Sequence, residues 1–217
     1  MLYIDKTYFI RKLAVPNTNE PTSDASIDLE MSIDRYVTQF LQETLGNVLN
    51  ADLEFYTTDG ELQIDAPQKW LNLFDGCSYD KDGKLYTWRG LRYTNGAFQV
   101  SIMANYVYLN HFSQTFNSSL GQIVIEGKNA TNADSTPHLV DVYNEFVEMY
   151  QGNHCNHPIR QYRNGVTFVD YFGTNSNNSG YVSYLQFLKD NEADYPNVPA
   201  QYLEFQNSFG LWLRASA

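Results

Sequence analysis

Apolar residues recur at roughly helical spacing after a polar loop at residues 15–22. Ser23 and Asp24 are residue types that commonly cap the start of a helix, and the acidic residues of the next turn complement the helix dipole. Gly46 favours the end of a helix. The pattern therefore predicts a helix over residues 24–45, whose apolar positions are Ile27, Met31, Tyr36, Val37, Phe40 and Leu41.

Two shorter elements flank this helix. Residues 1–12 are amphipathic, and we expect them to form a strand or a short helix that acts as an arm. On the other side, Pro67 suits the first turn of a helix, and Asp75-Gly76 suits its end. A second, shorter helix is therefore predicted between them, carrying Trp70, Leu71 and Phe74.

Residues 77–88 contain Asp82-Gly83 between aromatic residues that favour strands. An Asp-Gly pair in that setting strongly indicates a β-hairpin. The acidic residues nearby also resemble a calcium-binding loop. An EF-hand, however, needs Asp or Asn at its first ligand position and Glu at its twelfth, where this chain has Ser78 and Arg89. The segment is therefore predicted to be a hairpin and not a calcium site.

Two further helices are predicted, over residues 96–115 and 136–151. The first has apolar residues on most of its faces, so it should be buried nearly all round. The second places its apolar residues on one side: Leu139, Tyr143, Phe146, Val147 and Tyr150. Between them, residues 121–127 are expected to form a strand or an extended crossing segment.

The character of the chain changes after residue 152, where Asn, Ser and Gly become dense. Pro196 and Pro199 precede a predicted final helix near 200–208. We expect residues 153–217 to be an extension with little core of its own that contacts neighbouring subunits. Residues 1–152 would form the main unit. The predicted fold class is mainly α (α+β), with a helical bundle core, a small β-hairpin or strand element and an extended, loop-rich C-terminal arm.

Composition adds two properties to this picture. Aromatic residues make up 15% of the chain, and they supply large contact areas both in cores and at protein interfaces. The net charge is −11, which opposes attraction to nucleic-acid phosphates or to anionic membranes. The acidic excess lies within residues 1–153, whereas residues 154–217 are nearly neutral.

The chain has two cysteines, too few for a disulfide framework. Cys155 stands beside His154 and His157, and these are recognised ligands of zinc or copper. A structural zinc site needs four ligands, and Cys77 and His138 are the distant residues that could complete it. A metal-stabilised module or small enzyme built on this cluster is one alternative function, although we favour a polar turn and no bound metal or cofactor.

Other chemistries have less support. The sequence contains no nucleophile elbow, phosphate-binding loop or dinucleotide fingerprint, so we do not expect an enzyme. The aromatic content allows a carbohydrate-binding module as a second alternative. Trp70 and Trp88 lie in core-like segments, however, and Trp212 is the tryptophan expected to be exposed. No apolar run approaches the length of a membrane span, and the N-terminal residues are unlike a signal peptide.

Six short segments carry a resemblance to a known family: 40–46, 70–76, 86–91, 104–108, 121–124 and 142–147. They include Phe40-Leu41-Gln42-Glu43-Thr44-Leu45-Gly46, Tyr86-Thr87-Trp88-Arg89-Gly90-Leu91 and Val142-Tyr143-Asn144-Glu145-Phe146-Val147. Their order resembles the head–tail connector, or ring-adaptor, proteins of tailed bacteriophages, especially those of crAss-like and related phages of Bacteroidetes hosts. The resemblance covers a little over half of the chain and rests on packing patterns.

The resemblance implies a virion structural protein, made in the host cytoplasm and located at the head–tail junction. Its copies would form a homo-oligomeric, twelve-fold ring below the portal protein and contact neighbouring tail and ring proteins. The ring would extend the DNA channel and provide the platform for tail attachment. An acidic lumen would keep genomic DNA from adhering as it passes.

Overall fold

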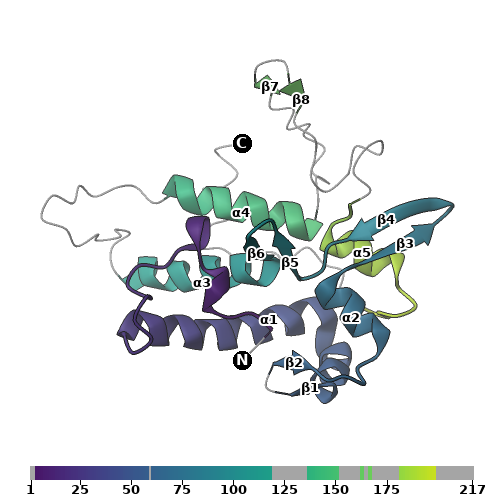
Figure 1. Cartoon of the computed structure of the whole chain (residues 1–217), viewed down its shortest axis with the longest axis horizontal. Coiled ribbons are helices and arrows are strands. Elements are labelled where there is room, and N and C mark those ends of the chain that lie inside the picture. The colour runs from purple at the N-terminus through teal and green to yellow at the C-terminus, as the bar shows by residue number, and fades with distance from the viewer. Residues whose placement is uncertain are drawn as a thin grey trace, which may run out of the picture.

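The computed structural model describes residues 3–58, 60–118, 136–151, 162–163, 166–167 and 181–198. Three helices form its framework: α1 (Asp24–Phe55), α3 (Ile102–Ser118) and α4 (Thr136–Gln151). They lie side by side in Figure 1, with α3 between α1 and α4 and in contact with both. Small antiparallel strand pairs surround this layer. The arrangement confirms the predicted mainly α (α+β) fold with a helical core.

The first helix begins and ends as predicted. The Ser23 hydroxyl accepts a hydrogen bond from the backbone N–H of Ser26, which caps the helix start. The backbone leaves helical geometry at Gly46, with φ 77° and ψ 167°, which confirms the predicted end at residue 45. The helical stretch that follows the break and continues to Phe55 was not predicted; it buries Leu49 and Leu53.

The second helix, α2 (Gln68–Asp75), follows Pro67 and ends at Gly76, which confirms the prediction. Trp70, Leu73 and Phe74 are its buried residues. At the end of α2, residues 74–76 lie very close to residue 90. A Cβ atom added to Gly90 would lie 2.4 Å from the carbonyl oxygen of Phe74, so this close approach requires glycine.

The predicted hairpin is confirmed as β3 (Cys77–Lys81) and β4 (Lys84–Trp88). Asp82 and Gly83 form its loop with φ values of 55° and 75°. Positive φ at both loop positions is the requirement of the turn that Asp-Gly favours.

A second hairpin was not predicted. Residues 96–101 were expected to start the long helix, but β5 (Arg92–Asn95) pairs with β6 (Phe98–Ser101), and α3 starts only at Ile102. Gly96 begins the two-residue loop with φ 63°, a conformation that glycine adopts readily. The prediction for these residues was wrong because the alternating apolar residues of β6 run directly into the helical pattern.

The helix over residues 136–151 is confirmed as α4. The predicted strand at 121–127 and the predicted helix near 200–208 lie outside the described residues. Two very short strand pairs complete the list: β1 (Thr57–Thr58) with β2 (Glu61–Leu62), and β7 (Tyr162–Arg163) with β8 (Val166–Thr167).

Part of the expected C-terminal extension belongs to the core. Helix α5 (Tyr184–Asp190) packs beside the β3–β4 hairpin and α4, and Tyr184, Phe187 and Tyr195 are at most 1% exposed. Residues 181–198 thus pack into the core of the main unit, and the predicted contacts of the extension with neighbouring subunits stay a prediction. One contact that holds α5 there is the Trp88 ring on β4, which stacks on Phe187 with centroids 5.3 Å apart.

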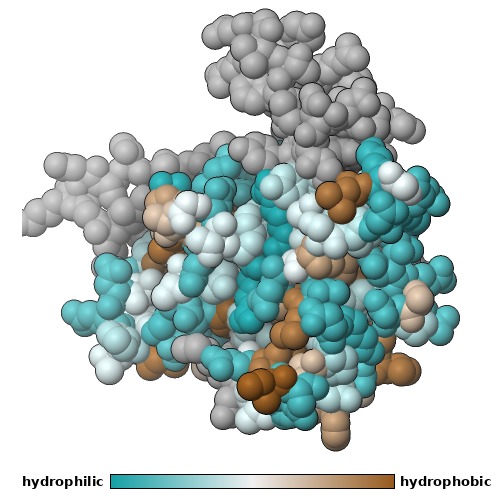
Figure 2. Space-filling model, turned by 45° about the vertical axis from the view of Figure 1, so that its right-hand side comes forward, coloured by the Kyte–Doolittle hydropathy of each residue, from teal (hydrophilic) through white to brown (hydrophobic). Residues whose placement is uncertain are grey.

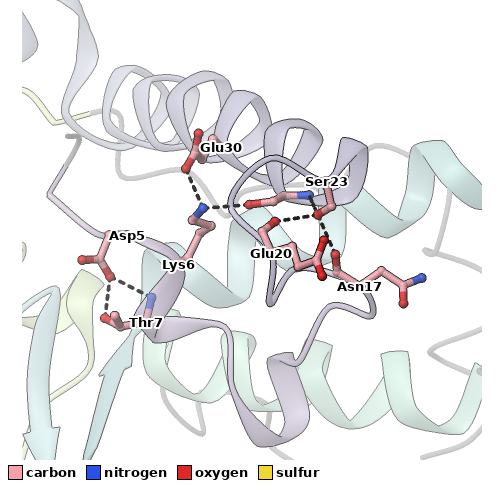
Figure 3. A network of polar contacts seen from close by, with 8 residues as sticks. Asp5, Lys6, Thr7, Asn17, Glu20, Ser23 and Glu30 are labelled. Atoms are coloured by element: carbon pink, nitrogen blue, oxygen red, sulfur yellow. Dashed lines mark hydrogen bonds and ion pairs between the residues drawn. The ribbon is translucent and has the colours of Figure 1, made fainter.

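The N-terminal segment also packs on its own chain. Residues 6–8 and 11–13 form two short 3-10 helices, η1 (Lys6–Tyr8) and η2 (Arg11–Leu13). Figure 3 shows Lys6 reaching α1, where its ammonium lies 2.7 Å from a Glu30 carboxylate oxygen. The Tyr3 ring stacks on Phe74 with centroids 4.4 Å apart. In the described residues this segment is therefore attached to the core of its own chain, and its role as an arm toward neighbouring subunits stays a prediction.

Candidate functional site

The outer face of α1 is strongly acidic. The helix sequence contains seven acidic residues and a single arginine. Four of the acids have partners within the chain: Glu30, Glu43, Asp52 and Glu54. Asp24, Asp28 and Asp34 are exposed and form no ion pair within the described ranges. The first part of α1 therefore presents uncompensated negative charge to solvent.

Large apolar side chains are also exposed around the molecule, and Figure 2 shows them as separate hydrophobic areas on a mostly polar surface. On α1, Met31 is 66% exposed, Val48 84% and Phe55 75%. Val48 and Phe55 are seven residues apart, so they share one side of the helix. Ile64 after β2 and Leu85 on β4 are exposed as well. Single exposed apolar residues are normal on a protein surface, so the pair Val48 and Phe55 is the better candidate for a contact surface.

A small pocket of about 230 Å³ is lined by residues from both helical stretches of α1, on either side of the bend at Gly46. Its walls are Tyr3, Thr38, Leu41, Asn50, Glu54, Thr57 and Gly60. The Asn50 amide donates to a Glu54 carboxylate oxygen at 2.8 Å, and the Tyr3 and Thr57 hydroxyls are 2.7 Å apart. Apart from Leu41, the side chains that line this pocket are polar. Reasoning from the sequence missed it because the helical stretch after Gly46, which carries Asn50 and Glu54, was not predicted.

A polar cluster joins α5 to the β3–β4 hairpin. The Asp190 side chain, 2% exposed, accepts hydrogen bonds from the Tyr79 hydroxyl at 2.8 Å and from the Gln186 amide at 2.7 Å. Lys81 donates to the same carboxylate. Burial, and then the hydrogen bond to Asp190, raise the pKa of Tyr79 above its ordinary value. Because the carboxylate is surrounded by donors, the cluster attaches the two elements and leaves no open coordination position.

The predicted metal ligands His154, Cys155 and His157 lie outside the described residues, so that alternative stays a prediction. Of the two distant candidates, Cys77 is half-buried, and burial raises the pKa of its thiol. His138 is exposed at the start of α4, and its Nε2 lies 2.7 Å from the carbonyl oxygen of Lys12. Within the described ranges, no group of three or more His, Cys, Asp or Glu residues could hold a metal ion.

The carbohydrate-binding alternative needs exposed rings. Trp70 is 0% and Trp88 3% exposed, which confirms their assignment to core-like segments, and Trp212 lies outside the described residues. Where side chains are described, no tyrosine or tryptophan is classed as exposed, and Phe55 is the exposed aromatic ring. This surface does not form an aromatic platform for a sugar.

No helix in the described part of the chain combines the length and the apolar character needed to cross a membrane. Comparisons of the chain with protein-family models, with curated proteins and with solved structures found no match.

Proposed function

We propose that this protein is a virion structural subunit whose copies form a ring at the head–tail joint of a tailed bacteriophage. The ring lies below the portal, extends the DNA channel and provides the platform for the tail. By resemblance to connector proteins it has twelve copies and is not an enzyme. The observation that carries the proposal is the acidic outer face of α1, with Asp24, Asp28 and Asp34 exposed together on a chain of net charge −11.

A channel for DNA benefits from a wall that repels phosphates, because attraction would slow the passage of the genome. Repulsion between like charges acts over about 10 Å at 0.1 M salt, a range that is useful in a narrow channel. The exposed apolar residues Met31, Val48, Phe55 and Leu85 supply contact areas for neighbouring subunits. Met31, Val48 and Phe55 lie on α1 and Leu85 lies on β4, so unlike surfaces of neighbouring copies can meet, and such contacts close into rings when the rotation is suitable.

Two measurements test this proposal. Native mass spectrometry and negative-stain electron microscopy of the purified full chain are expected to show closed rings. Immunogold labelling of virions is expected to place the protein at the neck. A chain that stays monomeric at high concentration and is missing from virions would overturn the proposal.

The charge argument has its own test in the triple variant Asp24→Asn, Asp28→Asn, Asp34→Asn. We expect the rings to persist and to bind duplex DNA at low salt measurably, whereas we expect no such binding by the native rings. If the rings of the triple variant bind duplex DNA no better than the native rings do, α1 does not line the channel. The control Asp80→Asn, Asp82→Asn, Glu192→Asn removes three exposed acids elsewhere.

A further inference from the structure

The hydrogen bonds of the pocket at Gly46 leave a defined set of free groups on its walls. The Thr57 hydroxyl donates to the Leu53 carbonyl oxygen at 2.8 Å, and a hydroxyl has one hydrogen to donate. Tyr3 must therefore donate to Thr57 across the 2.7 Å contact. Both oxygens keep lone pairs, so each of them remains an acceptor.

The other side of the pocket follows the same rule. Thr38 donates its hydroxyl hydrogen to the Asp34 carbonyl oxygen at 2.8 Å. Asn50 is 5% exposed, and its side-chain nitrogen must face Glu54, because a carboxylate accepts and does not donate. The Asn50 carbonyl oxygen and the second carboxylate oxygen of Glu54 are left to accept further bonds. The second N–H of the Asn50 amide remains a donor. The walls thus present mainly acceptor oxygens, with one negative charge.

The charges around the pocket agree with this account. Burial, with a smaller contribution from Glu54, raises the pKa of Tyr3, so the phenol stays neutral. Arg92, the nearby cation, already binds the carboxylate of Asp75 at 3.1 Å and the carbonyl oxygen of Tyr3 at 3.2 Å. The Arg92 guanidinium is therefore bound to these partners beside the pocket and does not act as the cation inside it.

We propose that this pocket binds a primary alkylammonium group. An ammonium carries three donors and one positive charge, which matches a wall of acceptors around one carboxylate. Leu41 supplies an apolar surface for the alkyl stem. The volume of about 230 Å³ is below the roughly 300–1,000 Å³ of sites for drug-sized ligands, and it suits a single short chain. The group can come from a free aliphatic amine or from a lysine side chain of a second copy. The inference does not depend on the proposed ring.

The first test is calorimetric titration of the full chain with n-butylammonium. We expect saturable binding, and no binding of n-butanol or butyrate, which have the same chain length without the charged donor. Tetramethylammonium should also fail, because it has the charge but no N–H group. Absence of saturable butylammonium binding, or equal binding of butanol, would overturn the proposal.

Variants locate the site. Glu54→Gln keeps the shape and removes the charge, so we expect at least a tenfold loss of butylammonium affinity, roughly the effect of one lost charged contact. Thr38→Val, which removes one acceptor, should lose less. The control Glu192→Gln removes an exposed carboxylate elsewhere and should bind normally. Equal affinity of Glu54→Gln and Glu192→Gln would overturn the assignment, provided that thermal unfolding shows both to be folded.

The source of the ammonium is decided by mass measurement of the assembled protein. If a lysine of a second copy occupies the pocket, Glu54→Gln and excess butylammonium will both weaken self-association, and Glu192→Gln will not. If self-association is unchanged while butylammonium still binds, the natural ligand is a free amine.

Discussion

Residues 24–45 and 47–55 are two helical stretches of α1 on either side of the break at Gly46, and they differ in how far they enter the aromatic core. The first part packs against α3, and the Phe40 ring meets the rings of Tyr106, Phe146, Tyr150 and Tyr184. The second part buries Leu49, Asn50 and Leu53 and leaves Val48 and Phe55 exposed. The first stretch therefore supplies the aromatic part of the core, whereas the second buries fewer side chains.

The largest expected difference comes from making one substitution in each part. Phe40→Ala removes a ring that is 0% exposed, and we expect it to lower the free energy of unfolding by about 3–5 kcal/mol. Phe55→Ala removes a ring that is 75% exposed, and its effect should stay within about 0.5 kcal/mol. Urea unfolding of both variants measures the contrast. Similar losses would mean that Phe55 is covered in solution.

Gly46 is the position that separates the two parts. Its φ of 77° and ψ of 167° lie in a region that is nearly restricted to glycine, so Gly46→Ala should cost about 1–3 kcal/mol. The substitution should also lower butylammonium affinity, because residues on both sides of the bend line the pocket. The control Gln42→Ala changes an exposed helical position one turn earlier and should be nearly neutral. A stable Gly46→Ala variant with normal ligand binding would show that the bend is dispensable.

These differences indicate which features the sequence could predict. The first part of α1, α2, α4 and the β3–β4 hairpin follow from local signals: apolar spacing, Ser23, Pro67 and Asp82-Gly83. Elements that depend on distant contacts were missed. Helix α5 has seven residues and is held by Trp88 and by the Tyr79 and Lys81 contacts to Asp190, more than 90 positions away along the chain.

The pocket was missed for a related reason. Its walls come from residues 3, 38, 41, 50, 54, 57 and 60, and no motif links these positions. Glycine at position 46 was interpreted as a helix end, and helical geometry does break there, but the second helical stretch with Leu49 and Leu53 was not predicted. A glycine within continuous apolar spacing can separate two stretches of helix, and the packing of the second stretch decides whether it forms.

Tyr106, which donates a hydrogen bond to Glu43 on the first part of α1, makes the stability of that part depend on alkaline pH. Burial, and then the nearby Glu43 carboxylate, raise the pKa of Tyr106 above the ordinary value of 10.0. The folded protein therefore holds this proton at a pH where the unfolded chain releases it. Stability from this group is fully present below pH 10 and falls by about 1.4 kcal/mol for each pH unit above it.

Tyr106→Phe removes that dependence along with the hydrogen bond to Glu43. Relative to native protein, we expect a loss of about 1 kcal/mol at pH 7 and a shallower decline of stability above pH 10. Unfolding by urea at several pH values measures both. Parallel declines in the native and variant proteins would show that Tyr106 ionises normally in the fold.

The smallest expected effect concerns His111, whose Nδ1 lies 2.8 Å from the hydroxyl of Ser32 on the first part of α1. Burial lowers the pKa of His111 from its ordinary 6.5, and the Asp28 carboxylate opposes this in part. Because the folded pKa is below the unfolded one, the contribution to stability is present above pH 6.5 and is lost as the pH falls. The histidine ring signals in NMR spectra should therefore show a midpoint below 6.5 for His111. Asp28→Asn should lower that midpoint further, whereas Asp24→Asn, one turn earlier, should leave it in place. A midpoint unchanged by Asp28→Asn would show that the acidic face of α1 acts on solvent and solutes alone and not on the interface with α3.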